Sequence, residues 1–483
     1  MERKWIAILM AGSLLTGAGS TYAGMQWYES KAGVLDRQIV PFKDSARAES
    51  GEQGSIEKVE QAYSLIFNSY VEKVEDKKLV EGAIKGMLST LEDPYSVYMD
   101  KETAKQFNQT LESSFEGIGA EVSSVDGKIV IVSPFKNSPA EKAGLKPNDQ
   151  ILKVDGESID GLDLFEATTK IRGKKGTPVV LEIGRKGLKD PLQVKVVRDE
   201  IPQITVYSDM KKVNGEKIGY LEITSFSEET SKEFNKELKI LEKEGLDALV
   251  IDVRGNPGGL LSSVEEILRE LIPKDKPLYQ IEERSGDKTR YFSNLAKAKD
   301  YPIGVLTNDG SASAAEILAG ALKEAGGYPV IGEKTFGKGT VQQAVPMGDG
   351  SNIKLTLFKW LTPDGNWIHK KGIEPTVEVN QPALYHTHPI QAEKSLKLDM
   401  NNEQVKNAQE ILAGLGFEPG RTDGYFSDKT EIAVKAFQRN NSMNVTGVIN
   451  AKTASALEEA AREAMKQEEN DLQLQTALRL LAR

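Results

Sequence analysis

The chain has 483 residues, which predicts about three domains, and 28% of them are charged, as in ordinary soluble globular proteins. The net charge of −10 argues against a nucleic-acid partner, and the lack of cysteine excludes disulfides, thiolate metal sites and cysteine nucleophiles. Only three histidines occur, His369, His386 and His388. Hydrolytic chemistry would therefore need a base other than histidine.

The N-terminus has the pattern of an export signal. A short charged start precedes an apolar stretch rich in Gly, Ser and Thr, and a small-x-small pattern ends before Gly24. Residues 5–28 carry no charge, so an uncleaved membrane anchor is the alternative. We expect residues 1–30 to be a signal peptide or an anchor, residues 31–55 to be a linker, and the protein to lie outside the cytoplasm, secreted or anchored to the membrane.

Hydrophobic periodicity divides the rest of the chain. The pattern is helical over 56–114, changes to short β-runs over 115–200, and becomes the strand–helix alternation of an α/β core over 201–380. A linker at 381–398 leads to a compact helical unit at 399–460 and to a helix at 461–483. The leucines of that last helix are too many for a solvated tail, so they pack on the domain or join a partner chain. Together with the N-terminal helices they predict a homodimer.

A serine-rich segment, residues 310–316, follows the apolar strand predicted at 303–307 and opens a helix. A strand–turn–helix junction raises a side chain to the edge of a sheet and leaves unpaired N–H groups at the positive end of the helix dipole. Ser311 or Ser313 is therefore a candidate nucleophile with part of an oxyanion hole built in. An ordinary helix cap is the alternative, and this segment alone favours the cap.

A lysine-containing segment, residues 332–343, nearly matches a phosphate-binding loop. Gly339 stands where that loop needs Ser or Thr, and a strand follows instead of a helix, so we do not expect a nucleotide site. Lys338 lies between two glycines, which close backbone approach requires. Burial would lower its pKa from about 10.4 towards the value of about 7–8 that suits an enzyme base. Gln342, four positions on, would share its strand face and hold the amine; an exposed turn lysine is the alternative.

A glycine turn, residues 252–260, again follows a predicted buried strand and precedes a helix. Gly258 and Gly259 lie in this turn and would present their N–H groups closely, as an oxyanion hole requires. A tight strand–helix connection without chemistry is the alternative.

Together, the three segments resemble the carboxy-terminal processing (tail-specific) peptidases, a Ser-Lys family with a crotonase-like α/β core. The resemblance covers about residues 56–380 and includes the step of 25 positions from Ser313 to Lys338. It implies that Ser313 is the nucleophile, Lys338 the general base and Gln342 the group that orients the lysine. The implied oxyanion donors are the amides of Ala314 and of Gly258 or Gly259. We expect Glu316, which the family shares, to lie on the helix surface or to have a structural role.

Residues 115–200 resemble a PDZ domain, on the segments 115–120, 138–145 and 149–156. Such a domain captures a peptide's terminal carboxylate on backbone N–H groups and accepts the peptide as an extra strand. We expect an apolar groove between the strand at 118–122 and the helix at 162–171, and a preference for apolar C-terminal residues. Arg172 would couple this groove to the protease core; a solvated charge is the alternative. The predicted peptide-binding residues are Gly117, Ile118, Gly119, Ala120 and Arg172.

Residues 399–460 resemble a peptidoglycan-binding-like three-helix domain, on motifs such as 415–417 and 423–426. This resemblance implies wall association, although such modules also serve as assembly pieces. His386 and His388 lie in a linker that lacks further ligands, so we predict no metal site, and no cofactor is implied elsewhere.

The sequence thus predicts a multidomain α+β and α/β protein: a crotonase-like α/β protease core with an inserted PDZ domain, N-terminal helices and a C-terminal three-helix domain. Its predicted function is a serine endopeptidase that cleaves protein substrates near their C-termini, in envelope or sporulation signalling. The predicted partners are proteins or peptides with free C-termini, peptidoglycan and a second copy of the chain. The alternatives are a non-catalytic wall-bound scaffold and a peptidoglycan hydrolase, and the hydrolase would need paired acids or a metal site.

Overall fold

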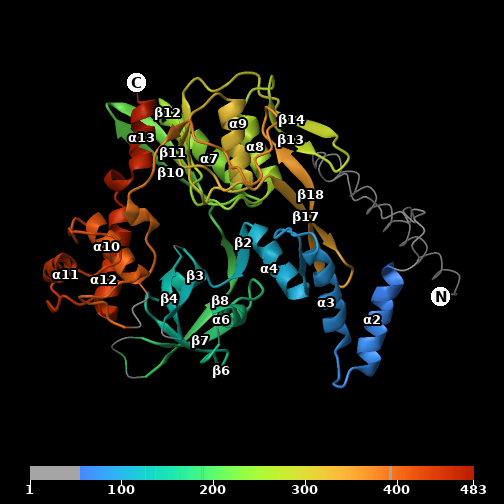
Figure 1. Cartoon of the computed structure of the whole chain (residues 1–483), viewed down its shortest axis with the longest axis horizontal. Coiled ribbons are helices and arrows are strands. Elements are labelled where there is room, and N and C mark those ends of the chain that lie inside the picture. Colours follow the sequence, from blue (N-terminus) through green and yellow to red (C-terminus); the bar gives the residue numbers. More distant parts are fainter. Residues whose placement is uncertain are drawn as a thin grey trace, which may run out of the picture. The chain divides into compact units, whose positions relative to one another are not determined.

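The computed structural model describes residues 55–125, 127–135, 137–162, 164–185, 188, 190–390 and 394–482 (Figure 1). The predicted signal or anchor segment, and the linker up to residue 54, lie outside these residues. Within the described part of the chain, no helix combines the length and the apolar character needed to cross a bilayer. The chain divides into two compact units, one ending at Ala83 and the other beginning at Ile84.

The N-terminal unit is helical and leaves apolar side chains at its surface. It contains α2 (Ser55–Ser69) and the first residues of α3 (Asp76–Ser89). The rings of Tyr63 and Phe67 stack with their centroids 5.7 Å apart. No residue of α3 is buried. The large apolar side chains exposed on and just after α2 are those of Ile56, Val59, Leu65, Ile66, Phe67, Tyr70 and Val71.

The second unit begins with the rest of α3 and continues through β1 (Val97–Met99) and α4 (Lys101–Leu111) into a small antiparallel sheet. That sheet has the strand order β3-β4-β5-β7-β8, with β6 paired to β5. Its strands are β3 (Ala120–Val125), β4 (Lys128–Pro134), β5 (Gln150–Val154), β6 (Glu157–Ser158), β7 (Pro178–Gly184) and β8 (Leu192–Val197). Its helices are α5 (Pro139–Lys142) and α6 (Leu164–Ile171).

The small sheet is an insertion within the chain of the larger domain. Its two ends are joined by an antiparallel ribbon of β2 (Ser114–Gly117) and β9 (Asp199–Pro202). Because both ends leave through one ribbon, the segment between them folds around its own core. Alternate residues of β7, Val179, Leu181 and Ile183, are buried in that core.

A six-stranded sheet forms the centre of the larger domain, in the order β10-β11-β12-β15-β16-β19. Its strands from β11 to β19 are parallel, and β10 is antiparallel to β11. The bounds are β10 (Val206–Val213), β11 (Glu216–Ile223), β12 (Ala248–Asp252), β15 (Ile303–Thr307), β16 (Val330–Gly332) and β19 (Val377–Glu378).

Both faces of this sheet are covered. Leu249 and Ile251 of β12 pack in one core with α7 (Thr230–Lys243), α8 (Leu261–Leu271) and α9 (Ala314–Glu324). The alternate residues Ala248 and Val250 pack in another core with the terminal helix α13 (Leu472–Leu481), which is red in Figure 1. Successive strand residues point to opposite faces, so the terminal helix buries the face that α7–α9 leave open.

The terminal leucines therefore pack against the chain's own core through α13. The helix predicted at 461–483 is not continuous, however. The helix α12 (Ala451–Met465) extends into that range, and the 3₁₀ turn η3 (Glu468–Asn470) separates it from α13. Leu472 and Leu480 stay exposed.

A second, five-stranded sheet and a helical module complete the fold. The sheet has the order β1-β18-β13-β14, with β17 paired to β18. Its further strands are β13 (Pro277–Glu282), β14 (Lys288–Phe292), β17 (Thr340–Pro346) and β18 (Asn352–Leu361). After the 3₁₀ turn η2 (Ala383–His386), the helices α10 (Glu403–Gly414) and α11 (Asp428–Asn440) share one core with α12. The architecture is the multidomain α+β and α/β class that the sequence predicts.

Candidate active site

Ser313 lies at a sharp turn between the buried strand β15 and the helix α9. Its φ of 55° and ψ of −114° place an L-residue in a conformation that costs about 1–3 kcal/mol. The preceding residues hold this turn: Ser311 Oγ donates to the carbonyl of Val253 at 2.7 Å, and the Ala312 amide donates to the carbonyl of Asn256 at 2.9 Å. Ser311 is fully buried, so its hydroxyl ties the turn together from inside.

Two backbone amides beside Ser313 make no hydrogen bond to any described residue, those of Gly259 and Ala314. The Gly258 amide differs, because it donates to Oδ1 of Asn256 at 2.8 Å. Gly258 also packs so closely on Ser313 that a Cβ built there would lie 2.7 Å from the Ser313 Cβ, so only glycine fits. The sequence favoured Gly259 but could not separate it from Gly258; in the fold the Gly258 amide is bonded to Asn256, and the Gly259 amide has no partner among the described residues.

Lys338 is fixed through its backbone. It lies in the loop between β16 and β17, where its amide donates to Oε2 of Glu316 at 2.8 Å and its carbonyl accepts from Trp360 Nε1 at 2.7 Å. A Cβ on Gly339 would lie 2.7 Å from the backbone nitrogen of His369. The glycine after Lys338 therefore permits the close backbone approach that the sequence predicted.

The surroundings of Lys338 lower the pKa of its ammonium group. Burial is the largest cause, because it removes water from the charged form, and the nearby charge of Lys354 adds repulsion. Asp93 and Glu316 act in the opposite direction. The Nζ atom lies 4.8 Å from the centroid of the Tyr95 ring. The net effect moves this lysine towards the neutral form that a general base needs.

Glu316 is a buried carboxylate with four hydrogen bonds. Its Oε2 accepts from the amides of Ser313 at 2.9 Å and Lys338 at 2.8 Å. Its Oε1 accepts from the hydroxyl of Thr335 at 2.6 Å and from the amide of Gly337 at 2.7 Å. Full burial excludes the helix-surface position that was one expectation for this residue and agrees with the structural one.

Gln342 lies close to the other candidate residues, but not in the way that strand periodicity suggested. Lys338 precedes β17, and a register shift falls between Val341 and Gln342, so the two side chains are not related by simple alternation. The Nε2 of Gln342 donates to the hydroxyls of Thr340 and Thr356, each at 3.0 Å. No hydrogen bond joins Gln342 to Lys338 among the described residues.

One cavity of about 540 Å³ brings the candidate residues together. Its walls also include the apolar side chains of Phe226, Ile317 and Trp360, together with Phe107 and Leu111 of α4. The candidate residues that line it are Gly258, Gly259, Ser313, Ala314, Lys338 and Gln342. Six residues chosen from three separate segments thus meet in one place.

Several residues that act on Lys338 have no signal in the sequence. Tyr95 and Asp93 come from the segment before β1, and Lys354 comes from β18, so nothing in their local sequence points to the site. Glu316 is different. Its position three residues after Ser313 is the spacing of a capping box, in which a Glu side chain returns to the first backbone amide of a helix. That spacing was the available signal.

The predicted peptide-binding residues lie at the entrance to the inserted small sheet. The amides of Ile118 and Gly119 make no hydrogen bond to other described residues, and the Ile118 side chain is buried in the small core. Gly117 is buried, and Ala120 begins β3. The guanidinium of Arg172 lies 4.5 Å from the centroid of the Phe115 ring, and burial lowers its pKa. Arg172 therefore packs on the ribbon that joins the small sheet to the larger domain.

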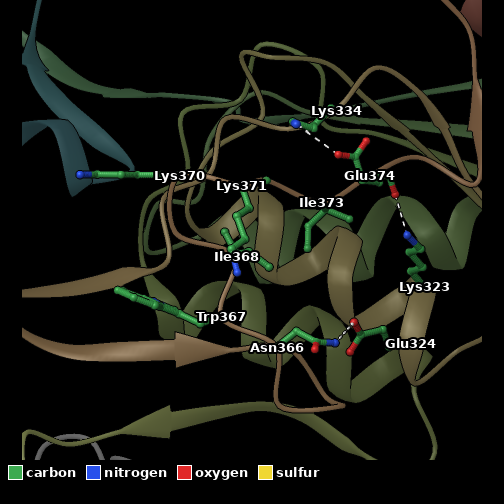
Figure 2. Close-up of a pocket in the computed structure, with 11 residues that line it drawn as sticks. Lys323, Glu324, Lys334, Asn366, Trp367, Ile368, Lys370, Lys371, Ile373 and Glu374 are labelled. Atoms are coloured by element: carbon green, nitrogen blue, oxygen red, sulfur yellow. Dashed lines mark hydrogen bonds and ion pairs between the residues drawn. The ribbon is translucent and has the colours of Figure 1, made fainter.

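Figure 2 shows a different pocket, lined by four lysines but by none of the predicted site residues. Lys334 pairs with the carboxylate of Glu374 at 3.1 Å, and Lys323 donates to the carbonyl of the same residue at 2.6 Å. Lys370 points away from both (Figure 2). The ammonium groups do not converge on a common point, so this pocket is not built as an anion site.

The comparisons with known proteins define the class. Residues 217–379 match the model of peptidase family S41, residues 117–196 match a PDZ domain, residues 401–457 match a peptidoglycan binding domain, and residues 14–103 match the activating protease CtpB N-terminal domain. The fold and these matches define an S41 peptidase that carries a PDZ domain.

Similar proteins narrow this class. The chain is 58% identical to the carboxy-terminal processing protease CtpB of Bacillus subtilis (strain 168), over 100% of this chain and 99% of that protein. It is 46% identical to CtpA of the same organism, over 88% of this chain and 90% of that one. A solved photosystem II D1 C-terminal processing protease is 27% identical, with a TM-score of 0.41, and spans 67% of this chain and 92% of its own. The chain belongs to the carboxy-terminal processing proteases of family S41.

Proposed function

We propose that this protein is a serine endopeptidase that cleaves protein substrates near their C-termini, with Ser313 as nucleophile and Lys338 as general base. One observation carries the proposal: Ser313, at a strained helix start, and Lys338, with its pKa lowered by burial, line one cavity. None of the three histidines lines it. A non-catalytic scaffold would have no use for a strained serine beside a desolvated lysine.

The reaction begins when neutral Lys338 accepts the hydroxyl proton of Ser313 and Oγ attacks the scissile carbonyl. The amides of Gly259 and Ala314 donate to the resulting oxyanion, and we assign Gly259 this role because the Gly258 amide is held by Asn256. Lys338 then gives the proton to the leaving amine. Water, deprotonated by the same lysine, hydrolyses the acyl-enzyme.

Gln342 holds the amine of Lys338 in this scheme. Its Nε2 donates to Thr340 and Thr356, which fixes the amide plane and leaves its carbonyl oxygen without a hydrogen bond among the described residues. An amide oxygen accepts a hydrogen bond from the lysine without adding charge, so it orients the amine and does not raise its pKa as a carboxylate would.

The inserted PDZ domain selects the substrate by its C-terminus. The unpartnered amides of Ile118 and Gly119 support the capture of a terminal carboxylate, and β3 supplies an edge for an added peptide strand. Arg172, packed on the joining ribbon, couples occupancy of this domain to the protease core.

The proposal includes the oligomeric state of the protein and its location in the cell. The exposed apolar side chains of α2 support a homodimer in which a second copy covers them. An extracytoplasmic location rests on the sequence pattern of residues 1–30, which supply a signal or an anchor. The three-helix module supports contact with peptidoglycan. A role in envelope or sporulation signalling rests on the resemblance to Gram-positive enzymes alone.

The test is digestion of an unfolded protein by the purified chain, with product termini identified by mass spectrometry. Ser313→Ala and Lys338→Ala should each abolish cleavage while leaving the fold intact. Lys334→Ala is the matched control, because Lys334 lies on the same loop but pairs with Glu374. Near-normal cleavage by folded Lys338→Ala protein would exclude Lys338 as the base.

A further inference from the structure

The start of α13 carries a buried polar cluster that reaches into the protease core. Asp471 caps this helix by accepting the amide of Leu474 at 2.9 Å. The same carboxylate accepts from both terminal nitrogens of Arg254, at 2.9 and 2.8 Å, and from Nε2 of Gln381 at 2.6 Å. This bidentate contact neutralises the charge of the Arg254 guanidinium and also fixes its orientation.

Arg254 begins the loop that carries Gly258 and Gly259. Its guanidinium also pairs with Asp252 at the end of β12, at 2.6 Å, and is largely buried between the two carboxylates. The next amide, that of Gly255, donates to Oδ1 of Asn308 at 2.7 Å, in the turn before Ser313. The position of Arg254 therefore fixes where the glycine loop leaves the sheet.

Gln473 connects the same helix to the loop of Lys338. It is fully buried; its Oε1 accepts from Arg254 at 3.1 Å, and its Nε2 donates to Oε1 of Glu333 at 3.0 Å. Glu333 opens the loop that leads to Lys338, and its amide donates to the carbonyl of Thr307 at 2.9 Å, at the end of β15. One helix start thus contacts the beginnings of two loops that line the cavity.

Anchoring of α13 does not require this cluster. The apolar side chains Leu474, Leu478 and Leu481 already pack on the sheet. Buried ion pairs contribute little net stability compared with apolar residues of similar volume, but they fix one arrangement of the groups that they join. The polar cluster is therefore better explained as a device that fixes the positions of the two loops than as one that holds α13 on the sheet.

We propose that the start of α13 is a positioning element of the active site. Asp471 acts through Arg254 on the loop that carries Gly258 and Gly259, and Gln473 acts through Glu333 on the loop that carries Lys338. Together they set the position of these two loops relative to each other. Asp471 and Gln473 touch no substrate and are positioning residues. This inference rests on the proposed function, because the two loops matter as a pair only if they carry the oxyanion donors and the base.

The test is Asp471→Asn in the full chain, which keeps the shape of the side chain and removes the charge. We expect kcat to fall about tenfold with KM within about twofold, because a displaced loop weakens transition-state contacts and leaves substrate capture intact. Reaction with a fluorophosphonate, a serine-directed probe, should slow by a similar factor. Glu468→Gln is the matched control: it removes the ion pair of the same terminal segment with Lys211, so kcat should not change.

Two further variants in α13 separate positioning of the loops from stability of the fold. Gln473→Met should lower kcat as Asp471→Asn does, and it replaces that variant if Asp471→Asn does not fold. Leu478→Ala should lower the melting temperature without changing kcat per folded molecule. If the wild-type chain labels at Ser313 and Asp471→Asn labels equally fast, the positioning role is wrong. If the wild-type chain neither labels at Ser313 nor cleaves, the proposed function itself is wrong.

Discussion

The backbone amides of Ser313 and Lys338 donate to the same atom, Oε2 of Glu316, at 2.9 and 2.8 Å. Two residues separated by 25 positions in the sequence are thereby held against one buried carboxylate. The other oxygen of Glu316 accepts from Thr335 and Gly337, so all four donors face a group that only accepts. The relative position of the proposed nucleophile and base is thus set at the backbone and does not depend on a direct bond between their side chains.

Glu316→Gln should therefore damage both stability and activity. An amide nitrogen at either oxygen position would face N–H or O–H donors, which leaves buried groups unsatisfied. We expect the free energy of unfolding to fall by about 2–3 kcal/mol and kcat to fall by about 100-fold. Glu324→Gln, at the other end of α9, is the control for loss of a glutamate from this helix. Chemical denaturation and peptide kinetics measure the two effects, and wild-type kcat in a folded Glu316→Gln protein would contradict the shared-anchor role.

The lowered pKa of Lys338 predicts a specific pH dependence. The base must be neutral, so kcat/KM should rise with pH and reach its midpoint below 10.5, the ordinary pKa of lysine. The free energy of unfolding should also rise with pH. Between the lowered pKa and 10.5, Lys338 is neutral in the folded state but protonated in the unfolded state, so the unfolded state binds more protons and stability rises with pH in this window. A pH–rate profile compared with a profile of unfolding free energy tests both, and a midpoint at or above 10.5 would contradict a desolvated base.

Two neighbours of Lys338 should move that midpoint in opposite directions. Lys354 lowers the pKa of Lys338 by repulsion, so Lys354→Gln should shift the pH–rate midpoint upwards. Asp93 raises it by attraction, so Asp93→Asn should shift the midpoint downwards. Lys334→Gln, which removes a lysine paired with Glu374, should leave it unchanged. A shift in Lys334→Gln equal to that in Lys354→Gln would mean that net charge, and not local contact, controls the titration.

Local sequence could predict the strand–turn–helix junction at Ser313 and the close packing around Lys338. An apolar run followed by small residues indicates the junction at Ser313, and the flanking glycines indicate the close packing around Lys338. It could not separate Gly258 from Gly259, because the difference is a side-chain bond from Asn256 that forms only in the folded loop. It also placed Lys338 on one strand face with Gln342, whereas Lys338 precedes β17 and a register shift, which has no clear sequence signal, falls between Val341 and Gln342.

Long-range partners explain the rest of what sequence could not reveal. Leucines at helical spacing in α13 fit an apolar surface, but they do not say whether that surface belongs to the same chain. Lys354 and Asp93 act on Lys338 across sheet pairings that join β1 and β18. Such pairings depend on the fold as a whole.

Asn256→Ala should weaken the proposed oxyanion hole without touching either donor. Asn256 is fully buried; its Oδ1 accepts from the Gly258 amide, and its Nδ2 donates to the carbonyl of Ile223 at 2.7 Å. Without these bonds the glycine loop loses its fixed shape, and loss of an oxyanion contact costs about 100- to 1000-fold in kcat. We expect a loss at the lower end of this range, with little change in KM. A larger effect on KM than on kcat would place Asn256 in substrate binding instead.

Gly119→Ala should separate tail recognition from chemistry. Gly119 has a φ of +72°, and a Cβ there would lie 2.6 Å from the Ser138 Cβ, so the substitution distorts the loop whose amides are proposed to hold the substrate carboxylate. Gly127→Ala is a matched control, because Gly127 has the same φ of +72° but no atom within 4 Å of an added Cβ. With a peptide that ends in a free carboxylate, Gly119→Ala should raise KM by about tenfold and Gly127→Ala should not. With the same peptide ending in an amide, wild type and Gly119→Ala should cleave alike, since no terminal charge remains to be captured. Equal cleavage of both peptides by the wild-type protein would exclude carboxylate capture.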